Sequence, residues 1–377
     1  LSPAPPLNVC LVLDRSTSMR GEKMDMVKGA ATQILRNLRP QDIFSVVTFS
    51  DRAEVVIPAS FYEDRTKLEV QIRMIHPSGA TEIFQGLEAG VKEVTRSLDH
   101  RRVNHIVLLT DGHTYGDEQE CLALASKISE QGIAISAMGI GKEWNDIFLD
   151  VLATRTGGSS AFIAEPQDIK RLLLEKFNAL AQIYAEELVL TQKPVDGVDL
   201  SYAFRLQPDS SPIVLDTPLR LGPILQDAST QLLLEYIIQP KAVKSELTDI
   251  LDGTLKVSIS SQPLAVPVLR LHLHRPVSGL PESEPPPEKI VQALSRLMLY
   301  RMQEKAREEV RNGRIDSATR HLQSLASNLL SQGERNLAQT ILLEVDHLKK
   351  QSTLSSEGSK KMNYGTRALL NAPPKKE

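Results

Sequence analysis

The sequence contains few cysteines and few aromatic residues, and each shortage excludes a class of protein. Two cysteines in 377 residues, Cys10 and Cys121, cannot build the cross-linked framework of a disulfide-dependent secreted domain. We therefore expect a reducing, cytoplasmic environment. Aromatic residues make up 4% of the chain and include one tryptophan, Trp144, so no aromatic cluster marks a binding hot spot.

The chain also lacks a charge bias and long apolar runs. The 44 Lys and Arg residues against 47 Asp and Glu residues give a formal net charge of -3, so no overall field attracts nucleic acid. No run approaches the ~20 apolar residues that cross a bilayer, and no signal peptide precedes Leu7. Because the chain begins with Leu rather than Met, removal of an N-terminal segment, and with it an extracellular location, stays open.

In the first half, apolar runs alternate with amphipathic stretches. The runs predict strands at 9–13, 43–49, 55–57, 106–110, 133–138 and 161–163, and the stretches predict helices at 23–38, 65–75, 84–96, 119–131, 145–154 and 168–184. Alternation of this kind predicts an α/β domain over residues 7–184 with a doubly wound, mostly parallel sheet. Ligands of such a sheet bind at the carboxyl ends of its strands.

Oxygen-bearing side chains follow three of these predicted segments. Asp14, Ser16 and Ser18 form a D-x-S-x-S array directly after the first strand, Thr81 lies in a glycine-containing loop before a helix, and Asp111 ends another strand. Carboxylate and hydroxyl oxygens are hard ligands that suit Mg²⁺, with Mn²⁺ or Ca²⁺ as other possibilities. The sequence therefore predicts a divalent-metal site built from these five residues.

This pattern resembles the von Willebrand factor A domain family over residues 7–184, in the form found in bacterial proteins. The family's metal-ion-dependent adhesion site consists of D-x-S-x-S, a distant Thr and a distant Asp-Gly, and all five ligand positions are present. The resemblance implies a non-enzymatic module whose metal is bridged by an Asp or Glu of a protein partner, often with a shift of the last helix, here 168–184. It also implies an adaptor or scaffold role, for example beside a MoxR-type AAA ATPase.

Three alternatives stay open. The first is a metal-dependent hydrolase in which Asp14, Asp111, His105 and His113 hold a metal-bound water. The second is a purely structural magnesium site. The third is a secreted adhesion protein resembling the heavy chains of inter-alpha-trypsin inhibitor, in which a sandwich also follows the A domain.

After residue 185 the pattern changes to short, partly alternating runs separated by turn residues. We expect an antiparallel β-sandwich at 185–275, with strands at 187–192, 198–206, 231–238, 254–260 and 266–274. Residues 1–6 are expected to be a tail belonging to this sandwich. His272 and His274 could form half of a zinc site, but with no Cys or third His nearby we favour a solvated strand face.

The remaining third combines a proline-rich segment with helical patterns. Residues 276–287 predict a semi-rigid linker, residues 288–371 a helical domain and residues 372–377 a disordered tail. Three apolar stripes predict three helices, the first beginning near Ile290, the second carrying Leu322 and the third carrying Ile341. We favour a small bundle that only packs against the chain's own sandwich over a peptide-binding repeat.

Overall fold

A computed structural model of the chain describes residues 4–62, 64–243, 246–261, 267–279 and 285–371. Contacts divide the chain into two compact units, Leu1–Val277 and Ser278–Glu377, and each is described by itself. The first unit contains the α/β domain and two antiparallel sheets, and the second is helical. None of the described helices combines the length and the apolar character that a bilayer crossing requires.

The α/β domain is built on a six-stranded sheet in the order β3-β2-β1-β4-β5-β6. Its strands are β1 (Leu7–Asp14), β2 (Ile43–Phe49), β3 (Ala53–Ser60), β4 (Val103–Thr110), β5 (Ile133–Ile140) and β6 (Ser160–Ile163). All neighbours pair in parallel except β2 and β3, so the edge strand β3 runs antiparallel. The mostly parallel, doubly wound sheet predicted from the sequence is confirmed.

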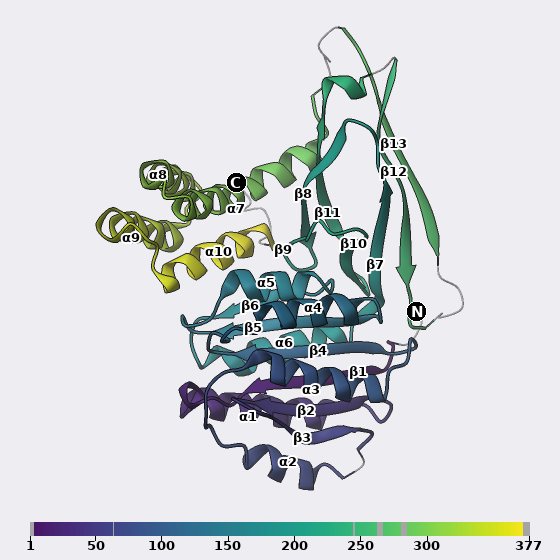
Figure 1. Cartoon of the computed structure of the whole chain (residues 1–377), viewed down its shortest axis with the longest axis vertical. Coiled ribbons are helices and arrows are strands. Elements are labelled where there is room, and N and C mark those ends of the chain that lie inside the picture. Colours follow the sequence, from purple (N-terminus) through teal and green to yellow (C-terminus); the bar gives the residue numbers. More distant parts are fainter. Residues whose placement is uncertain (1–3, 63, 244–245, 262–266, 280–284, 372–377) are drawn as a thin grey trace. The chain divides into compact units, whose positions relative to one another are not determined.

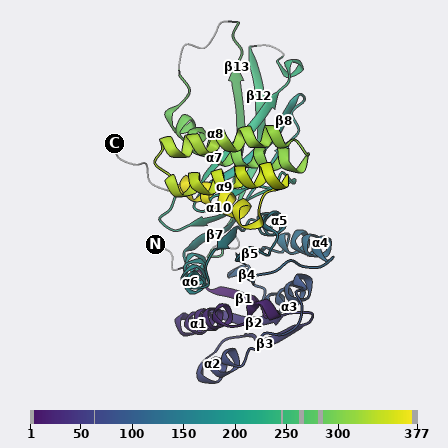
Figure 2. The ribbon, with the colours of Figure 1, turned by 90° about the vertical axis from the view of Figure 1, so that its left-hand side faces the viewer.

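Helices cover both faces of this sheet (Figure 1). They are α1 (Glu22–Asn37), α2 (Thr66–Arg73), α3 (Ile83–Arg96), α4 (Glu118–Ser129), α5 (Asp146–Thr154) and α6 (Asp168–Leu180), with a short 3₁₀ turn at Thr17–Met19. Figure 2 shows α1 and α6 on one side of the strands and α3 and α4 on the other. Because both faces are covered, every residue of β1, β2 and β4 is buried, which explains their unbroken apolar sequences.

Two boundaries of this domain differ from the predictions. Helix α6 ends at Leu180 rather than at residue 184, and strand β7 begins at Ile183, because Ile183 and Ala185 alternate with the exposed Tyr184 as a strand requires. Residues 4–6, expected in the sandwich, belong to neither of its sheets. Instead the carbonyls of Ala4 and Pro5 accept hydrogen bonds from Arg39 of the α/β domain, at 3.2 and 2.7 Å.

The rest of the first unit consists of two antiparallel sheets with the strand orders β10-β7-β12-β13 and β11-β8-β9. The strands are β7 (Ile183–Lys193), β8 (Val198–Gln207), β9 (Ser211–Pro212), β10 (Leu219–Leu225), β11 (Gln231–Ile238), β12 (Leu247–Ser258) and β13 (Val268–Pro276), with a 3₁₀ turn at Pro240–Ala242. Leucines from both sheets, among them Leu190, Leu219 and Leu234, share one apolar core. The predicted antiparallel sheets are thus present, although β9 and β10 were not predicted, because Gly222 and Pro223 break the alternation of β10.

The second unit contains α7 (Glu288–Arg311), α8 (Ile315–Ser331), α9 (Arg335–Gln351) and α10 (Ser356–Asn371). Leu322, Leu325 and Ile341 lie in its apolar core. The sequence predicted three of these helices and missed α10, whose buried positions include the polar residues Lys360 and Arg367 and so give no apolar stripe. Part of the predicted linker, 280–284, and the predicted tail, 372–377, lie outside the described residues.

Candidate metal centre

Asp14 is the last residue of β1 and is fully buried. Its carboxylate folds back on the following loop, where Oδ1 accepts a hydrogen bond from the Ser16 amide at 2.7 Å. Oδ2 accepts the hydroxyl of Thr110 from the neighbouring strand β4 at 2.7 Å. Burial raises the pKa of Asp14, while the hydrogen bonds from Ser16 and Thr110 act in the opposite direction. The side chain is therefore fixed between the ends of two adjacent strands.

The two serines and Asp111 form a continuous chain of oxygen atoms beside Asp14. Ser16 Oγ and Ser18 Oγ lie 3.0 Å apart, and Ser18 Oγ donates to Asp111 Oδ1 at 2.7 Å. Asp111 directly follows β4, which pairs in parallel with β1, so both aspartates emerge at the same edge of the sheet. Four of the five predicted ligands are thus brought together by direct hydrogen bonds or adjacent strand ends.

The loop that carries Thr81 is docked against the same edge. Its backbone is held by two hydrogen bonds, from Ser78 N to Arg15 O at 2.7 Å and from Thr17 N to Gly79 O at 3.1 Å. Gly79 adopts a left-handed conformation, with φ at 82°, and has Asp51 and Ser50 against it, so a side chain there would be both strained and obstructed. The D-x-S-x-S loop and the Thr81 loop therefore form one packed unit.

Thr81 itself is buried and lies beside the residue that follows Asp111. A Cβ atom placed on Gly112 would come within 3.1 Å of Thr81 Oγ1, so the absence of a side chain at Gly112 makes room for this hydroxyl. The structure therefore brings the fifth predicted residue to the edge at which the other four gather. Metal binding by this set is taken up below as a proposal.

Several supporting residues were not found from the sequence. Thr114 Oγ1 accepts the Ile83 amide at 3.0 Å, and Asp117 Oδ2 accepts the Phe84 amide at 3.0 Å. These two side chains from the loop after Asp111 therefore satisfy free amides in the first turn of α3, directly after Thr81. The sequence around Thr114 and Asp117 is that of an ordinary polar loop, so their role in accepting the amides of α3 becomes visible only from the packing of the two loops.

The donor set fits a hard divalent cation. It offers two carboxylates and three hydroxyls, the oxygen ligands that Mg²⁺ and Ca²⁺ prefer. The side chain of Lys23, in the first turns of α1, already contacts this group: its Nζ lies 2.5 Å from Asp111 Oδ2 and 3.3 Å from the Ser18 carbonyl oxygen. An ammonium drawn to this point indicates that the cluster of oxygens favours positive charge.

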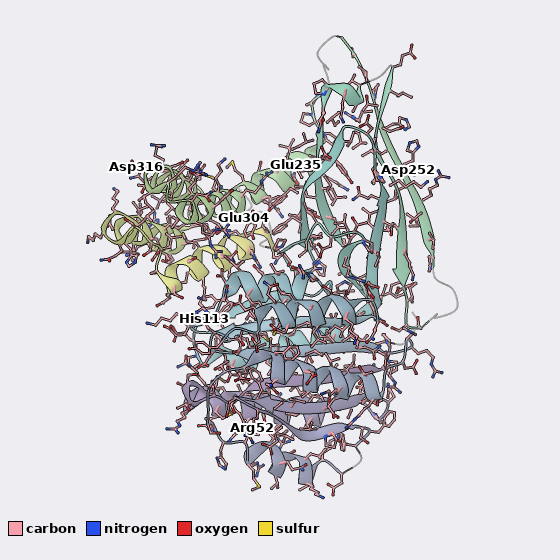
Figure 3. All side chains as sticks on the ribbon, in the orientation of Figure 1. Arg52, His113, Glu235, Asp252, Glu304 and Asp316 are labelled. Atoms are coloured by element: carbon pink, nitrogen blue, oxygen red, sulfur yellow. The ribbon has the colours of Figure 1, made fainter. Side chains whose placement is uncertain are left out.

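Of the two histidines of the hydrolase alternative, His105 does not join this group. His105 lies near the start of β4, about 20 Å along the strand from Asp111, and its Nε2 is 2.8 Å from Ser136 Oγ. Burial lowers the pKa of His105 to about 3, so the imidazole is neutral. His113 lies in the exposed loop after Gly112 (Figure 3). The proposed constellation of two aspartates and two histidines is therefore wrong for His105.

Comparison with known protein families identifies two segments. The family described as von Willebrand factor type A domain matches residues 8–178, and the family described as Sll0103-like, C-terminal alpha-helical domain matches residues 288–372. The chain is 33% identical over 179 residues to the uncharacterized protein sll0103 of Synechocystis, an alignment that covers 47% of this chain and 42% of that protein. It is 29% identical over 245 residues to the inter-alpha-trypsin inhibitor heavy chain H4 of Sus scrofa, covering 57% of this chain and 26% of the relative. The chain thus spans less than half the length of these relatives.

Solved structures share the fold at low sequence identity. A von Willebrand factor type A protein from Catenulispora acidiphila superposes with a TM-score of 0.76 at 16% identity, covering 96% of this chain and 89% of that one. The ArnB paralog VWA2 from Sulfolobus acidocaldarius gives a TM-score of 0.53 at 13% identity, covering 98% and 90% of the two chains. The two family matches identify residues 8–178 as a von Willebrand factor type A domain and residues 288–372 as an Sll0103-like C-terminal helical domain, and the solved structures show likeness of fold alone.

Proposed function

We propose that this chain is a non-enzymatic, divalent-metal-dependent interaction module that binds an Asp or Glu side chain of a protein partner. The observation that carries the proposal is the convergence of Asp14, Ser16, Ser18, Thr81 and Asp111 at one edge of the sheet. Mg²⁺ held there supplies an electrophilic position that a partner carboxylate can occupy.

Hydrogen bonds within the chain already orient the two carboxylates of this position, although the Lys23 ammonium beside Asp111 must move when a metal ion binds. The hydrogen bonds from Ser16 and Thr110 fix Asp14, and the contact with Ser18 orients Asp111. Three of the five ligands are neutral hydroxyls, so the two carboxylates only balance the charge of a dication, and an acidic partner group remains attractive. Because these loops are packed before a partner arrives, little entropy is lost on binding.

A protein-capture experiment tests the proposal. Intact protein with Mg²⁺ is compared with the Asp14→Ala variant as bait, and the partners lost from the variant are identified. Ser16→Ala and Thr81→Ala should abolish metal-dependent binding while the protein stays folded by circular dichroism. Full partner binding in the presence of a chelator contradicts the proposal.

The same series separates the interaction role from a purely structural site. If the metal only stabilises the loops, Asp111→Ala lowers the melting temperature but leaves partner capture intact. If the metal bridges to the partner, Asp111→Ala removes capture even at a temperature well below the melting transition.

Helix α6 is the proposed coupling element between the metal edge and the sandwich. Lys176 of α6 lies 3.5 Å from the Asp209 carboxylate, in the turn between β8 and β9, and donates to Ser159 Oγ at 2.9 Å. Only two residues separate the end of α6 from β7. Amide hydrogen exchange of α6 should change when Mg²⁺ and an acidic peptide are added together, and unchanged protection argues against coupling.

The partner class follows from the family resemblance. We propose an adaptor or scaffold role in a multiprotein complex, with a MoxR-type AAA ATPase as the example, in the cytoplasm. Both cysteines are free and buried, which supports this location. Among captured proteins, an ATPase of that class supports the adaptor role, and its absence from a capture that does return Mg²⁺-dependent partners contradicts it.

A second candidate is a secreted adhesion protein. The observation that favours it is the match to the heavy chain H4 of Sus scrofa, which spans 245 residues and so exceeds the length of the A domain. Fractionation of the source cells decides between the two: recovery from the medium supports the secreted candidate, and recovery from the cytoplasm supports the adaptor.

A further inference from the structure

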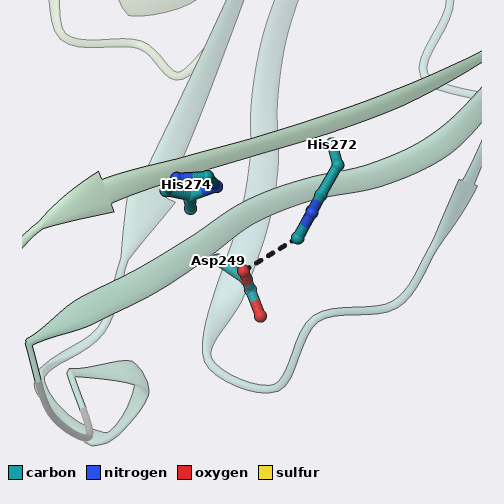
Figure 4. A group of neighbouring side chains, drawn as sticks. All are labelled: Asp249, His272 and His274. Atoms are coloured by element: carbon teal, nitrogen blue, oxygen red, sulfur yellow. Dashed lines mark hydrogen bonds and ion pairs between the residues drawn. The ribbon is translucent and has the colours of Figure 1, made fainter.

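Two strands of the four-stranded sheet place two imidazoles and a carboxylate together, far along the chain from the A domain. His272 and His274 are alternate residues of β13 and so lie on the same face of the sheet. Asp249 of the antiparallel partner β12 is directly opposite His274. His272 Nε2 lies 2.9 Å from Asp249 Oδ1 (Figure 4), and the two imidazole rings are 5.5 Å apart.

A local irregularity of β12 produces this grouping. The register of the pair shifts between Asp249 and Leu251, so that Asp249 opposes His274 while Asp252 opposes His272. In a regular strand, residues three apart point to opposite faces, but the extra residue of a bulge restores them to the same face. The carboxylate of Asp249 therefore joins the histidine face.

The three side chains have the composition and the spacing of a transition-metal site. One ligand atom from each, two imidazole nitrogens and a carboxylate oxygen, can be chosen so that all lie within 4.8 Å of one another. Ligands about 2.0–2.1 Å from a tetrahedral zinc ion are separated by roughly 3.4 Å, which small side-chain rotations can reach from these positions. The sheet hydrogen bonds hold the two strands, so little backbone ordering is required.

The neighbouring charges leave these ligands available. Asp252, which lies on the same face, is engaged with Lys193 at 3.3 Å and with Arg270 at 3.9 Å, so those two cations lie against Asp252. The side chains of His272 and Asp249 are 53% and 58% exposed, so an aqueous ion can reach them. The hydrogen bond between His272 and Asp249 holds their nitrogen and oxygen atoms close together, and a metal ion would replace the proton between them.

We propose that Asp249, His272 and His274 form a surface site for Zn²⁺, with water in the fourth position. This site is separate from the oxygen site at Asp14 and differs from it in chemistry, since imidazole nitrogen favours zinc whereas hydroxyl oxygen favours magnesium. The open fourth position makes it a point at which a histidine or carboxylate of another molecule can bind.

Isothermal titration of ZnCl₂ into the full chain, in buffer with excess Mg²⁺, tests the site. We expect one zinc ion per chain at this site, a loss of affinity of at least about tenfold in each of His272→Ala, His274→Ala and Asp249→Ala, and no change in His100→Ala, which removes an exposed histidine elsewhere. Co²⁺ provides an independent readout, because tetrahedral cobalt absorbs strongly in the visible range, and the band should vanish in His272→Ala.

Two results overturn the proposal. One is equal zinc affinity and an equal cobalt spectrum in the wild type and the His272→Ala and His274→Ala variants, which means that the ions bind elsewhere. The other is the absence of stoichiometric zinc binding to the folded wild type. Zinc binding that persists in Asp14→Ala supports the independence of the two sites, and its loss in that variant contradicts it.

Discussion

The ammonium group of Lys23 lies 2.5 Å from Oδ2 of Asp111, whose side chain is shielded from solvent. Lys23 belongs to the first turns of α1 and Asp111 to the end of β4, so the contact joins two segments 88 residues apart. The same ammonium also contacts the Ser18 carbonyl oxygen. A cation supplied by the chain is therefore placed against the group of oxygens proposed to bind a metal.

Removing this internal cation should strengthen metal binding. Because the ammonium and the metal compete for Asp111, Lys23→Ala is expected to raise the Mg²⁺ affinity by about 3- to 10-fold, the range of one partly exposed ion pair. Titration calorimetry measures the change. Lys28→Ala is the matched control, since Lys28 lies on the same helix but contacts the Arg73 carbonyl. Weaker binding in Lys23→Ala means that the lysine assists the metal rather than competing with it.

The hydroxyl of Thr110 should contribute to stability through Asp14. Thr110→Val keeps the shape of the side chain but removes the 2.7 Å hydrogen bond to a buried carboxylate, so we expect a loss of about 1–3 kcal/mol in the free energy of unfolding. Urea denaturation without added metal measures it. Thr95→Val, at an exposed position of α3, serves as the control and should change stability by less than about 0.5 kcal/mol. Equal effects of the two substitutions contradict the role given to Thr110.

Glu186 should make stability fall as the pH rises. Burial, aided by the negative charge of Asp99, raises the pKa of Glu186 from 4.5 to about 9. Between these values the unfolded chain releases the proton while the folded chain retains it, so ionisation favours unfolding across this window and the penalty is complete above it. Glu186→Gln is therefore expected to stabilise the protein at pH 8 by about 1–3 kcal/mol, and the difference should disappear below pH 4.5.

Thermal unfolding of the Glu186→Gln variant from pH 4 to pH 9 checks this dependence. The exposed Glu165 offers the matched control, because Glu165→Gln makes the same substitution at a solvent-exposed position. A Glu186→Gln variant whose advantage is independent of pH shows that the effect comes from packing rather than from ionisation.

Two glycines in helices should respond to alanine in opposite directions. Gly29, in the middle of α1, has open space around it, so Gly29→Ala should stabilise the protein by about 0.5–1 kcal/mol through the helix propensity of alanine. Gly90 of α3 packs closely on Val12 of β1, so Gly90→Ala forces α3 away from the sheet and should destabilise by about 1–3 kcal/mol. Denaturant unfolding compares the two, and a stabilised Gly90→Ala contradicts this packing.

Patterns in the sequence were sufficient to predict the α/β class of the A domain and the edge of the sheet at which its oxygen-bearing residues lie. Buried parallel strands require continuous apolar runs, so β1 and β4 are visible as such, and the polar residues that follow them must lie at the carboxyl edge of the sheet. The proximity of Asp14 and Asp111 could therefore be predicted from the sequence, because it follows from the pairing of two strands and from a short local motif.

Features that depend on contacts between distant segments could be found only in the folded chain. The position of Lys23 against Asp111 is set by how α1 packs, and helix α10 escaped prediction because its buried face is polar. The register shift that places Asp249 beside His272 arises from one extra residue in β12. The alternation of apolar and polar residues along one strand does not reveal such a shift. The periodicity of side chains along a strand indicates which face of the sheet each residue prefers. The residue opposite it on the neighbouring strand is determined only when the strands pair.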